Sequence, residues 1–159
     1  MSRARHWSVC ALFSAWLWLS ASPVWADARV AVGGHTGVNL DAGNVHLGAD
    51  LVVPVSQLSP RVQLSVWPSF AHVFIHDTRD VNLLGVDFPF ELRLDSPSIT
   101  PYFAPGLALS MQYGVQLKLN LIGGCFFDLG SRVQLFTELA IRLVNGTYVD
   151  VLGGVLFAL

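Results

Sequence analysis

The stretch VQLKLNL, residues 115–121, alternates apolar and polar side chains without a break. Successive side chains of a β-strand point to opposite faces of a sheet, so this stretch predicts a strand with one apolar and one polar face. The alternation continues as far as Asp128. Residues 27–159 contain neither the spacing of an amphipathic helix nor 18 consecutive uncharged apolar residues. The pattern therefore indicates an all-β fold.

The same pattern repeats on both sides of this stretch, in eight runs that are separated by short turn-forming segments. The predicted strands are Arg29–Leu40, Asn44–Val55, Arg61–Ile75, Val81–Leu94, Ile99–Gln112, Val115–Asp128, Arg132–Val144 and Thr147–Leu159. In the fourth of these, the alternation changes phase at Leu83-Leu84, where we expect a β-bulge. Eight strands joined by short turns predict an antiparallel sheet that closes on itself.

The first 26 residues follow a different pattern. Arg3 and Arg5 precede an uncharged apolar stretch, and Val24-Trp25-Ala26 has the small-residue pattern of a cleavage site. These features predict a secretory signal peptide, with an uncleaved N-terminal anchor as the alternative. We expect a signal peptide over residues 1–26 and a barrel domain over residues 27–159, with cleavage after Ala26 or after Ala28.

Composition narrows the classes of function. The chain has 159 residues, of which 53% are hydrophobic and only 13% charged, with a formal net charge of −2. This balance argues against disorder and against nucleic-acid binding, which needs clustered Lys and Arg. Residues 27–159 contain 18 charged side chains, of which twelve fall on the polar strand faces and six in turns or at the N-terminus. The other face of each predicted strand carries no charge.

The question is whether this apolar face meets a protein core or lipid. The apolar faces carry large aromatic residues such as Phe70, Phe88 and Phe103, whereas the polar faces carry many Gly, Ala and Ser residues. Small residues suit the narrow interior of an eight-stranded barrel. The predicted strands also exceed the ~9–11 residues that a tilted membrane strand needs. An eight-stranded antiparallel up-and-down transmembrane barrel is therefore favoured, and the alternative is a soluble secreted or periplasmic lipocalin-like barrel that binds an apolar ligand.

With these strands, the chain resembles the small eight-stranded outer-membrane β-barrel proteins of Gram-negative bacteria, of the OmpA/OmpX type. The segment 101–106, PYFAPG, is similar to strands of this class. The end, residues 154–159, resembles the C-terminal signal that such proteins present to the outer-membrane assembly machinery, with Phe157 as its aromatic residue, although here Leu159 comes last. The resemblance implies a bacterial outer-membrane location, contact with membrane lipid and the assembly machinery as a partner. We further expect a monomer with no cofactor.

Inside such a barrel the polar faces would meet. Pairing the first two strands across a two-residue turn, Ala42-Gly43, sets His35 opposite Asp50 and Asn39 opposite His46. A three-residue loop in the last hairpin sets Arg142 opposite Asp150. Charges in a narrow, dry space are expected to pair. The expected lumen network consists of His35, Asp50, Asp87, Glu91, Arg93, Lys118, Glu138, Arg142 and Asp150.

Enzyme and metal sites find less support in the sequence. A carboxylate can orient an imidazole for general-base catalysis, which makes His35, Asp50 and Ser65 a candidate catalytic set, but a structural pair is favoured. Outer-membrane lipases and deacylases place a His and a Ser two residues apart on a strand, whereas here Phe74 follows His72 at that distance. The histidines show no metal-ligand spacing. The favoured role is structural or envelope-associated, and a lipid-modifying enzyme remains the second alternative.

Overall fold

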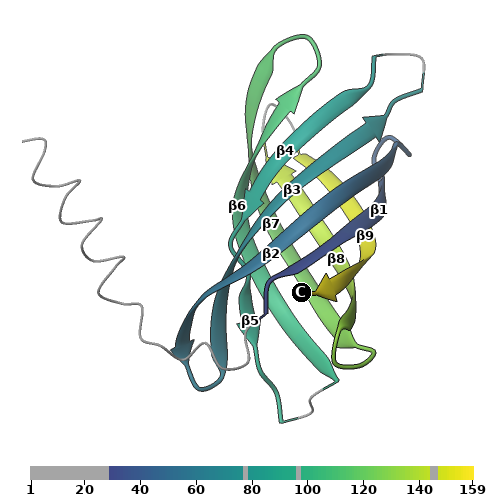
Figure 1. Ribbon diagram of the computed structural model, residues 1–159. Coiled ribbons are helices and arrows are strands. Elements are labelled where there is room, and N and C mark those ends of the chain that lie inside the picture. Colours follow the sequence, from purple (N-terminus) through teal and green to yellow (C-terminus); the bar gives the residue numbers. More distant parts are fainter. Residues whose placement is uncertain (1–28, 77–78, 96–97, 144–146) are drawn as a thin grey trace, which may run out of the picture.

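The computed structural model describes residues 29–76, 79–95, 98–143 and 147–159 as a closed antiparallel β-barrel (Figure 1). The predicted signal peptide and both cleavage positions lie outside the described residues. In the part of the chain that is described, no helix is long and apolar enough to span a membrane. The barrel closes because β1 pairs with β9 as well as with β2.

The order of the strands around the barrel is the same as their order along the chain. They are β1 (Ala31–Asn39), β2 (Val45–Ser59), β3 (Val62–Phe74), β4 (Val81–Asp87), β5 (Phe90–Leu92), β6 (Ile99–Met111), β7 (Val115–Asp128), β8 (Val133–Leu143) and β9 (Thr147–Ala158). Both β4 and β5 lie between β3 and β6 and keep one register with each of them. They are two parts of one strand, so the predicted eight-stranded antiparallel barrel is confirmed.

The predicted bulge at Leu83-Leu84 is wrong. The register of β4 with β3 and β6 is unbroken there, with Leu83 facing the lumen and Leu84 facing outward. The apparent change of phase arises because the lumen is apolar at this end, where Leu83 packs with Val81, Ala71 and Val73. The pairing of β2 with β3 does contain register shifts, and both lie in the second half of β2.

The first hairpin has a wider turn than the sequence suggested. Asn39 N donates to Asn44 O at 2.8 Å, and Gly43 adopts a φ of 70°, which favours glycine. This four-residue connection shifts the register by two residues, so His35 lies opposite Gly48. The predicted alignment of His35 with Asp50 and of Asn39 with His46 is therefore wrong, although both faces point as expected.

The last hairpin shows the same kind of shift. Arg142 lies opposite Tyr148, and Asp150 lies opposite Ala140, so the predicted alignment of Arg142 with Asp150 is also wrong. The connecting residues 144–146 lie outside the described part of the chain. A shift of two residues keeps every side chain on its own face of the sheet, which is why the inside and outside of the strands were still predicted correctly.

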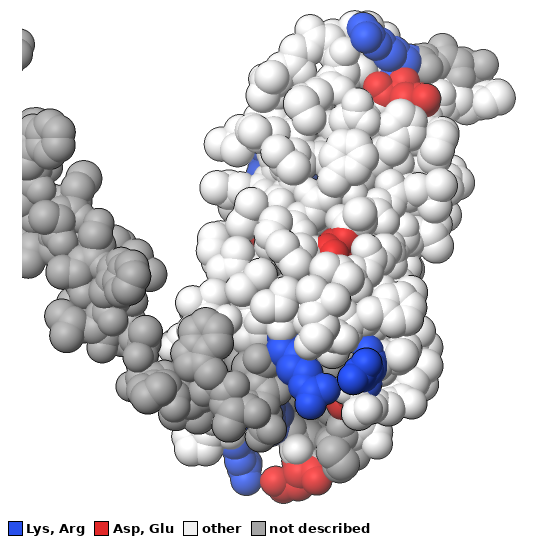
Figure 2. All heavy atoms as spheres, viewed as in Figure 1, with Lys and Arg blue, Asp and Glu red and all other residues white. Residues whose placement is uncertain are grey.

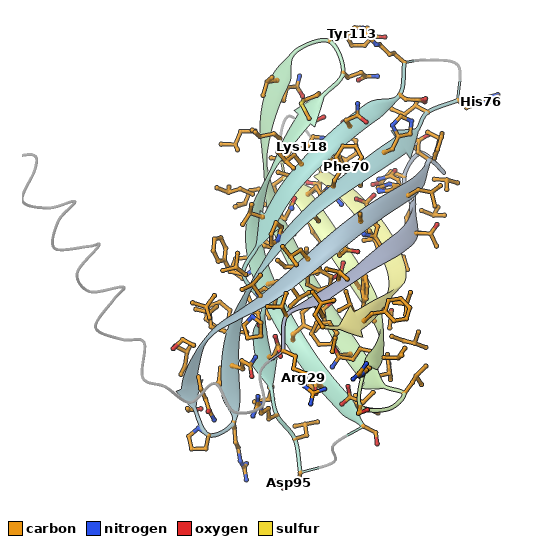
Figure 3. The ribbon with its side chains drawn as sticks, viewed as in Figure 1. Arg29, Phe70, His76, Asp95, Tyr113 and Lys118 are labelled. Atoms are coloured by element: carbon orange, nitrogen blue, oxygen red, sulfur yellow. The ribbon has the colours of Figure 1, made fainter. Side chains whose placement is uncertain are left out.

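The outer surface of the barrel is apolar. Figure 2 shows that most charged side chains visible from this side gather near the two ends of the barrel. His76 and Tyr113 mark one end, and Arg29 and Asp95 mark the other (Figure 3). The exposed apolar side chains include Leu47, Phe70, Phe74, Leu84, Phe88, Phe103, Leu117, Leu119, Leu135, Leu139, Ile141 and Phe157.

Close packing inside the barrel makes one glycine a sensitive position. A Cβ atom added at Gly154 would lie 2.4 Å from the backbone oxygen of Gly34 and 2.5 Å from the ring of Phe136. We expect Gly154→Ala to lower the free energy of unfolding by about 1–3 kcal/mol, because backbone and ring must both shift. Denaturant unfolding in lipid vesicles would measure this loss. Gly123→Ala is the matched control, since nothing lies within 4 Å of that Cβ, and an equal loss in both variants would contradict the packing argument.

Candidate functional site

The lumen is filled by an aromatic layer that the sequence analysis did not foresee. Trp67, Tyr102, Phe126 and Phe136 are all buried. The ring centroids of Trp67 and Phe136 lie 5.0 Å apart, and those of Tyr102 and Phe126 lie 4.4 Å apart. The phase of β3 could have predicted the place of Trp67, because Ser65 precedes it by two residues on the polar face. The layer fills this part of the lumen with closely packed rings.

Next to this layer, the predicted pair His35 and Asp50 forms. His35 Nδ1 lies 2.8 Å from Asp50 Oδ2, and the Trp67 indole donates to Asp50 Oδ1 at 3.0 Å. The two residues meet diagonally across β1 and β2, since Gly33 is the direct partner of Asp50. Both carboxylate oxygens of Asp50 therefore have partners, and the side chains of His35 and Asp50 are only 6% and 2% exposed.

Asp150 is the centre of a second group, to which four strands contribute. Arg142 Nε donates to Asp150 Oδ2 at 2.6 Å, and Asn39 Nδ2 donates to Oδ1 at 2.7 Å. His46 Nε2 lies 3.5 Å from the same Oδ1 atom. Asp150 is 1% exposed, so these contacts replace the water that an ionised carboxylate would otherwise require. Arg142 and Asp150 are thus brought together, and Asn39 and His46 join them.

Two further predicted residues, Asp87 and Glu138, are buried carboxyls without a cationic partner in the described part of the chain. Asn120 Nδ2 donates to Asp87 at 3.0 Å, and the Tyr102 hydroxyl donates to Glu138 at 2.5 Å. Both carboxyls line a cavity of about 30 Å³, together with His35. The buried atoms His35 Nε2 and Asn120 Oδ1 have no hydrogen-bond partner among the described residues. A polar cavity of this size has room for one water molecule.

The remaining predicted residues lie apart from these groups. Glu91 accepts a hydrogen bond from Ser65 at 2.5 Å, and Arg93 donates to Gln63. The Lys118 ammonium lies 5.2 Å from the ring centroid of Tyr148. The nine residues therefore form separate groups rather than one continuous network.

The candidate catalytic set is not assembled. Ser65 is fully buried and its hydroxyl donates to Glu91, not to His35. His72, on the outer side of the barrel, bonds to Asn82 at 2.9 Å and to Asp80 at 3.3 Å, and the Ile75 amide that donates to Asp80 lowers the pKa of that carboxyl. Asn82 and Leu47 are the direct neighbours of His72 on the adjoining strands. The neighbours of His72 on the adjoining strands therefore supply no hydroxyl nucleophile.

The structure places the two residues of the predicted assembly signal at the end of β9 and just beyond it. Phe157 and Leu159 are 49% and 75% exposed. In the described ranges, no group of three or more His, Cys, Asp or Glu residues could hold a metal ion.

Comparison with known proteins supports the fold. No protein-family model matches the chain, and no curated protein sequence matches it. The N-terminal β-barrel domain of Pseudomonas aeruginosa OprF is similar in structure, with a TM-score of 0.62 and 17% identity over 84% of this chain and 98% of that one. Neisserial surface protein A has a TM-score of 0.61 and 10% identity, over 83% and 96%. The outer-membrane enzyme PagL has a TM-score of 0.55 and 13% identity, over 79% and 97%.

The chain therefore has the fold of the small eight-stranded bacterial outer-membrane barrels. Its apolar outer face, with the charged groups Asp50, Glu138 and Asp150 buried inside, is arranged as the membrane environment of this class requires. Proteins with this fold include an enzyme as well as other outer-membrane and surface proteins, so the fold alone does not define an activity.

Proposed function

We propose that this protein is an integral outer-membrane barrel with a structural or envelope-associated role and no enzymatic activity. The observation that carries the proposal is the division between the two faces of the sheet. Phe88, Leu119 and Ile141 are at least 36% exposed, whereas Glu138 and Asp150 are buried inside. Soluble monomers rarely expose continuous apolar patches beyond a few hundred Å², so a belt of apolar side chains around the barrel is favourable only in lipid.

The alternatives fit the geometry less well. A lipocalin-like barrel would enclose its apolar faces around a ligand, but here those faces point outward. The lipid-modifying enzyme lacks an assembled nucleophile, since Ser65 bonds to Glu91. The His35–Asp50 pair is also buried too deeply to meet a lipid substrate.

The expected partners follow from closure of the barrel. Since β1 and β9 pair with each other, Ala31 lies opposite Ala158, and both ends of the barrel domain lie at one rim. We place this rim in the periplasm, where Phe157 and Leu159 would be presented to the assembly machinery. A closed barrel leaves no open strand edge that another copy could extend, which supports a monomer in contact with lipid.

Membrane fractionation combined with heat-modifiable gel mobility tests this proposal. We expect the protein in the outer-membrane fraction, extracted only by detergent, with different mobilities before and after boiling because the folded barrel resists unfolding. Recovery in the aqueous fraction after lysis would contradict membrane integration. An altered lipid profile in cells that express the protein, absent in a His35→Ala variant, would contradict the non-enzymatic role.

A charge placed on the outer face distinguishes lipid from water directly. Leu139 lies midway along β8 and is 48% exposed. We expect Leu139→Arg to lower the free energy of unfolding in lipid vesicles by about 2–4 kcal/mol, because an arginine near the bilayer midplane is poorly solvated. Leu139→Phe is the matched control, with a small expected effect. A loss within about 0.5 kcal/mol for Leu139→Arg, which is typical of a water-exposed position, would mean that this face meets solvent.

A further inference from the structure

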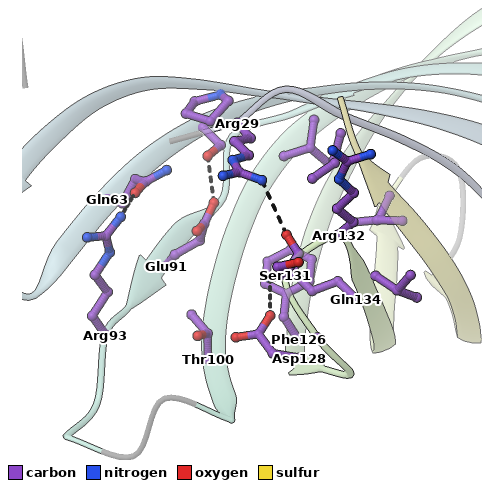
Figure 4. Close-up of a pocket in the computed structure, with 18 of the residues that line it drawn as sticks. Arg29, Gln63, Glu91, Arg93, Thr100, Phe126, Asp128, Ser131, Arg132 and Gln134 are labelled. Carbon is purple, nitrogen blue, oxygen red and sulfur yellow. Dashed lines mark hydrogen bonds between the residues drawn. The ribbon is translucent and has the colours of Figure 1, made fainter. Parts of the chain in front are cut away.

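A cavity of about 500 Å³ lies at the end of the barrel where β1 begins and β9 ends (Figure 4). Arg29, the first described residue, and Ala158, the last residue of β9, both line it. Phe126, a member of the aromatic layer, also lines it. The cavity is therefore a vestibule that ends at the aromatic layer, and its volume lies in the range of small-molecule sites.

Three arginines from three separate segments line this vestibule: Arg29 before β1, Arg93 after β5 and Arg132 before β8. Figure 4 shows their side chains around one space. Arg61 lies between β2 and β3, but it does not line the cavity and has an ion-pair contact with Asp95 at 3.8 Å. Arg61 is therefore at the same end of the barrel as the three arginines but outside the vestibule that they line.

Among the described residues, none of these three arginines forms an ion pair within 4.0 Å, although Arg93 interacts electrostatically with Glu91. Arg29 Nη1 makes only a long 3.5 Å contact with the backbone oxygen of Ser131, and Arg93 donates to the neutral amide of Gln63. The guanidinium of Arg132 has no hydrogen bond or ion pair within the described ranges. Arg29, Arg93 and Arg132 therefore have unused donors.

Two carboxylates line the same vestibule but bond to neutral partners. Glu91 accepts from the Ser65 hydroxyl at 2.5 Å, and Asp128 accepts from the Gln134 amide at 2.7 Å. Neither forms an ion pair within 4.0 Å of any of the three arginines. Because guanidinium groups match the geometry of carboxylate and phosphate oxygens, three arginines that line one cavity with free donors suit an anion with several such oxygens.

We propose that this vestibule binds a small multivalent oxyanion, with carboxylate or phosphate groups, that enters from the periplasmic end of the barrel. Arg29, Arg93 and Arg132 bind the anionic groups. Phe126 and Leu156 provide apolar contact deeper in the cavity. The fold and the groups of the lumen do not by themselves indicate a ligand, and this binding site therefore goes beyond the proposed function.

Isothermal titration of the detergent-purified barrel tests this site, with citrate as the carboxylate probe and pyrophosphate as the phosphate probe. We expect one binding site per chain, with affinity that falls as salt rises because the contacts are electrostatic. The probe that binds more tightly identifies the oxyanion class. Arg132→Gln is expected to weaken binding about tenfold, which corresponds to one charge-assisted hydrogen bond. The triple variant, which combines Arg29→Gln, Arg93→Gln and Arg132→Gln, is expected to abolish binding.

Arg61→Gln is the matched control, because it removes an arginine from the same end of the barrel without changing the vestibule. Heat-modifiable mobility shows whether each variant is folded, and the single variants decide the test if the triple variant is not. Failure of both probes to bind at millimolar concentration would overturn the proposal. So would an equal loss of affinity in Arg61→Gln and Arg132→Gln, which would indicate general surface charge rather than a site.

Discussion

Replacement of Arg142 by Met is expected to lower the free energy of unfolding by about 3–5 kcal/mol, the typical cost of a buried charge that loses its partner. The variant removes the 2.6 Å hydrogen bond from Arg142 Nε to Asp150, whose side chain has almost no contact with solvent. Asn39 remains bonded to Asp150, but an amide supplies no compensating charge, and His46 Nε2 lies farther away, at 3.5 Å. Denaturant unfolding in lipid vesicles, followed by gel mobility, would measure the loss.

A second substitution identifies the cause of that loss. Asp150→Asn removes the charge that Arg142→Met leaves unpaired, so the double variant should be more stable than Arg142→Met alone. Lys118→Met is the matched control, since the Lys118 ammonium lies 5.2 Å from the ring centroid of Tyr148 and has no hydrogen bond or ion pair within 4.0 Å among the described residues. We expect it to cost no more than about 1 kcal/mol. If the losses of Arg142→Met and Asp150→Asn simply add in the double variant, the two side chains do not act as a pair.

The strands and their faces could be predicted because the side-chain period of a β-strand is fixed by its geometry. A residue such as Leu119 can face only outward once Lys118 faces inward. The same period explains why the registers were missed by two residues, since an even shift moves no side chain to the other face. Only the turn decides between such registers, and the Asn39 side chain, which accepts a hydrogen bond from Ala42 N at 2.8 Å, favours the wider one.

The lumen was harder to predict because its polarity varies along the barrel axis. Val81 and Leu83 line an apolar end of the lumen. The apolar Leu83 on the inner face made the alternation change phase at Leu83-Leu84, which led to the wrong prediction of a bulge. The meeting of His35 with Asp50 was predicted from a wrong register, and it occurs because diagonal neighbours lie within reach of long side chains. The vestibule depends on residues next to three different strands, Arg29, Arg93 and Arg132. No single segment of the sequence indicates that these residues line one cavity.

Trp67→Ala is the other substitution with a large expected effect, at about 3–5 kcal/mol. Trp67 is 4% exposed and contacts the rings of Tyr102, Phe126 and Phe136. Its loss leaves a void in the layer that fills the barrel, and it also removes the 3.0 Å hydrogen bond to Asp50. Denaturant unfolding in vesicles would measure the combined cost.

Trp67→Phe separates the two contributions. A phenyl ring restores much of the packing but cannot donate to Asp50, so this variant should lose about 1–3 kcal/mol, the cost of leaving a buried acceptor unsatisfied. Phe70→Ala provides a matched control on the same strand, because Phe70 is 45% exposed on the outer face. An equal loss in Trp67→Ala and Phe70→Ala would mean that contact with lipid, rather than the filled lumen, dominates the stability of the barrel.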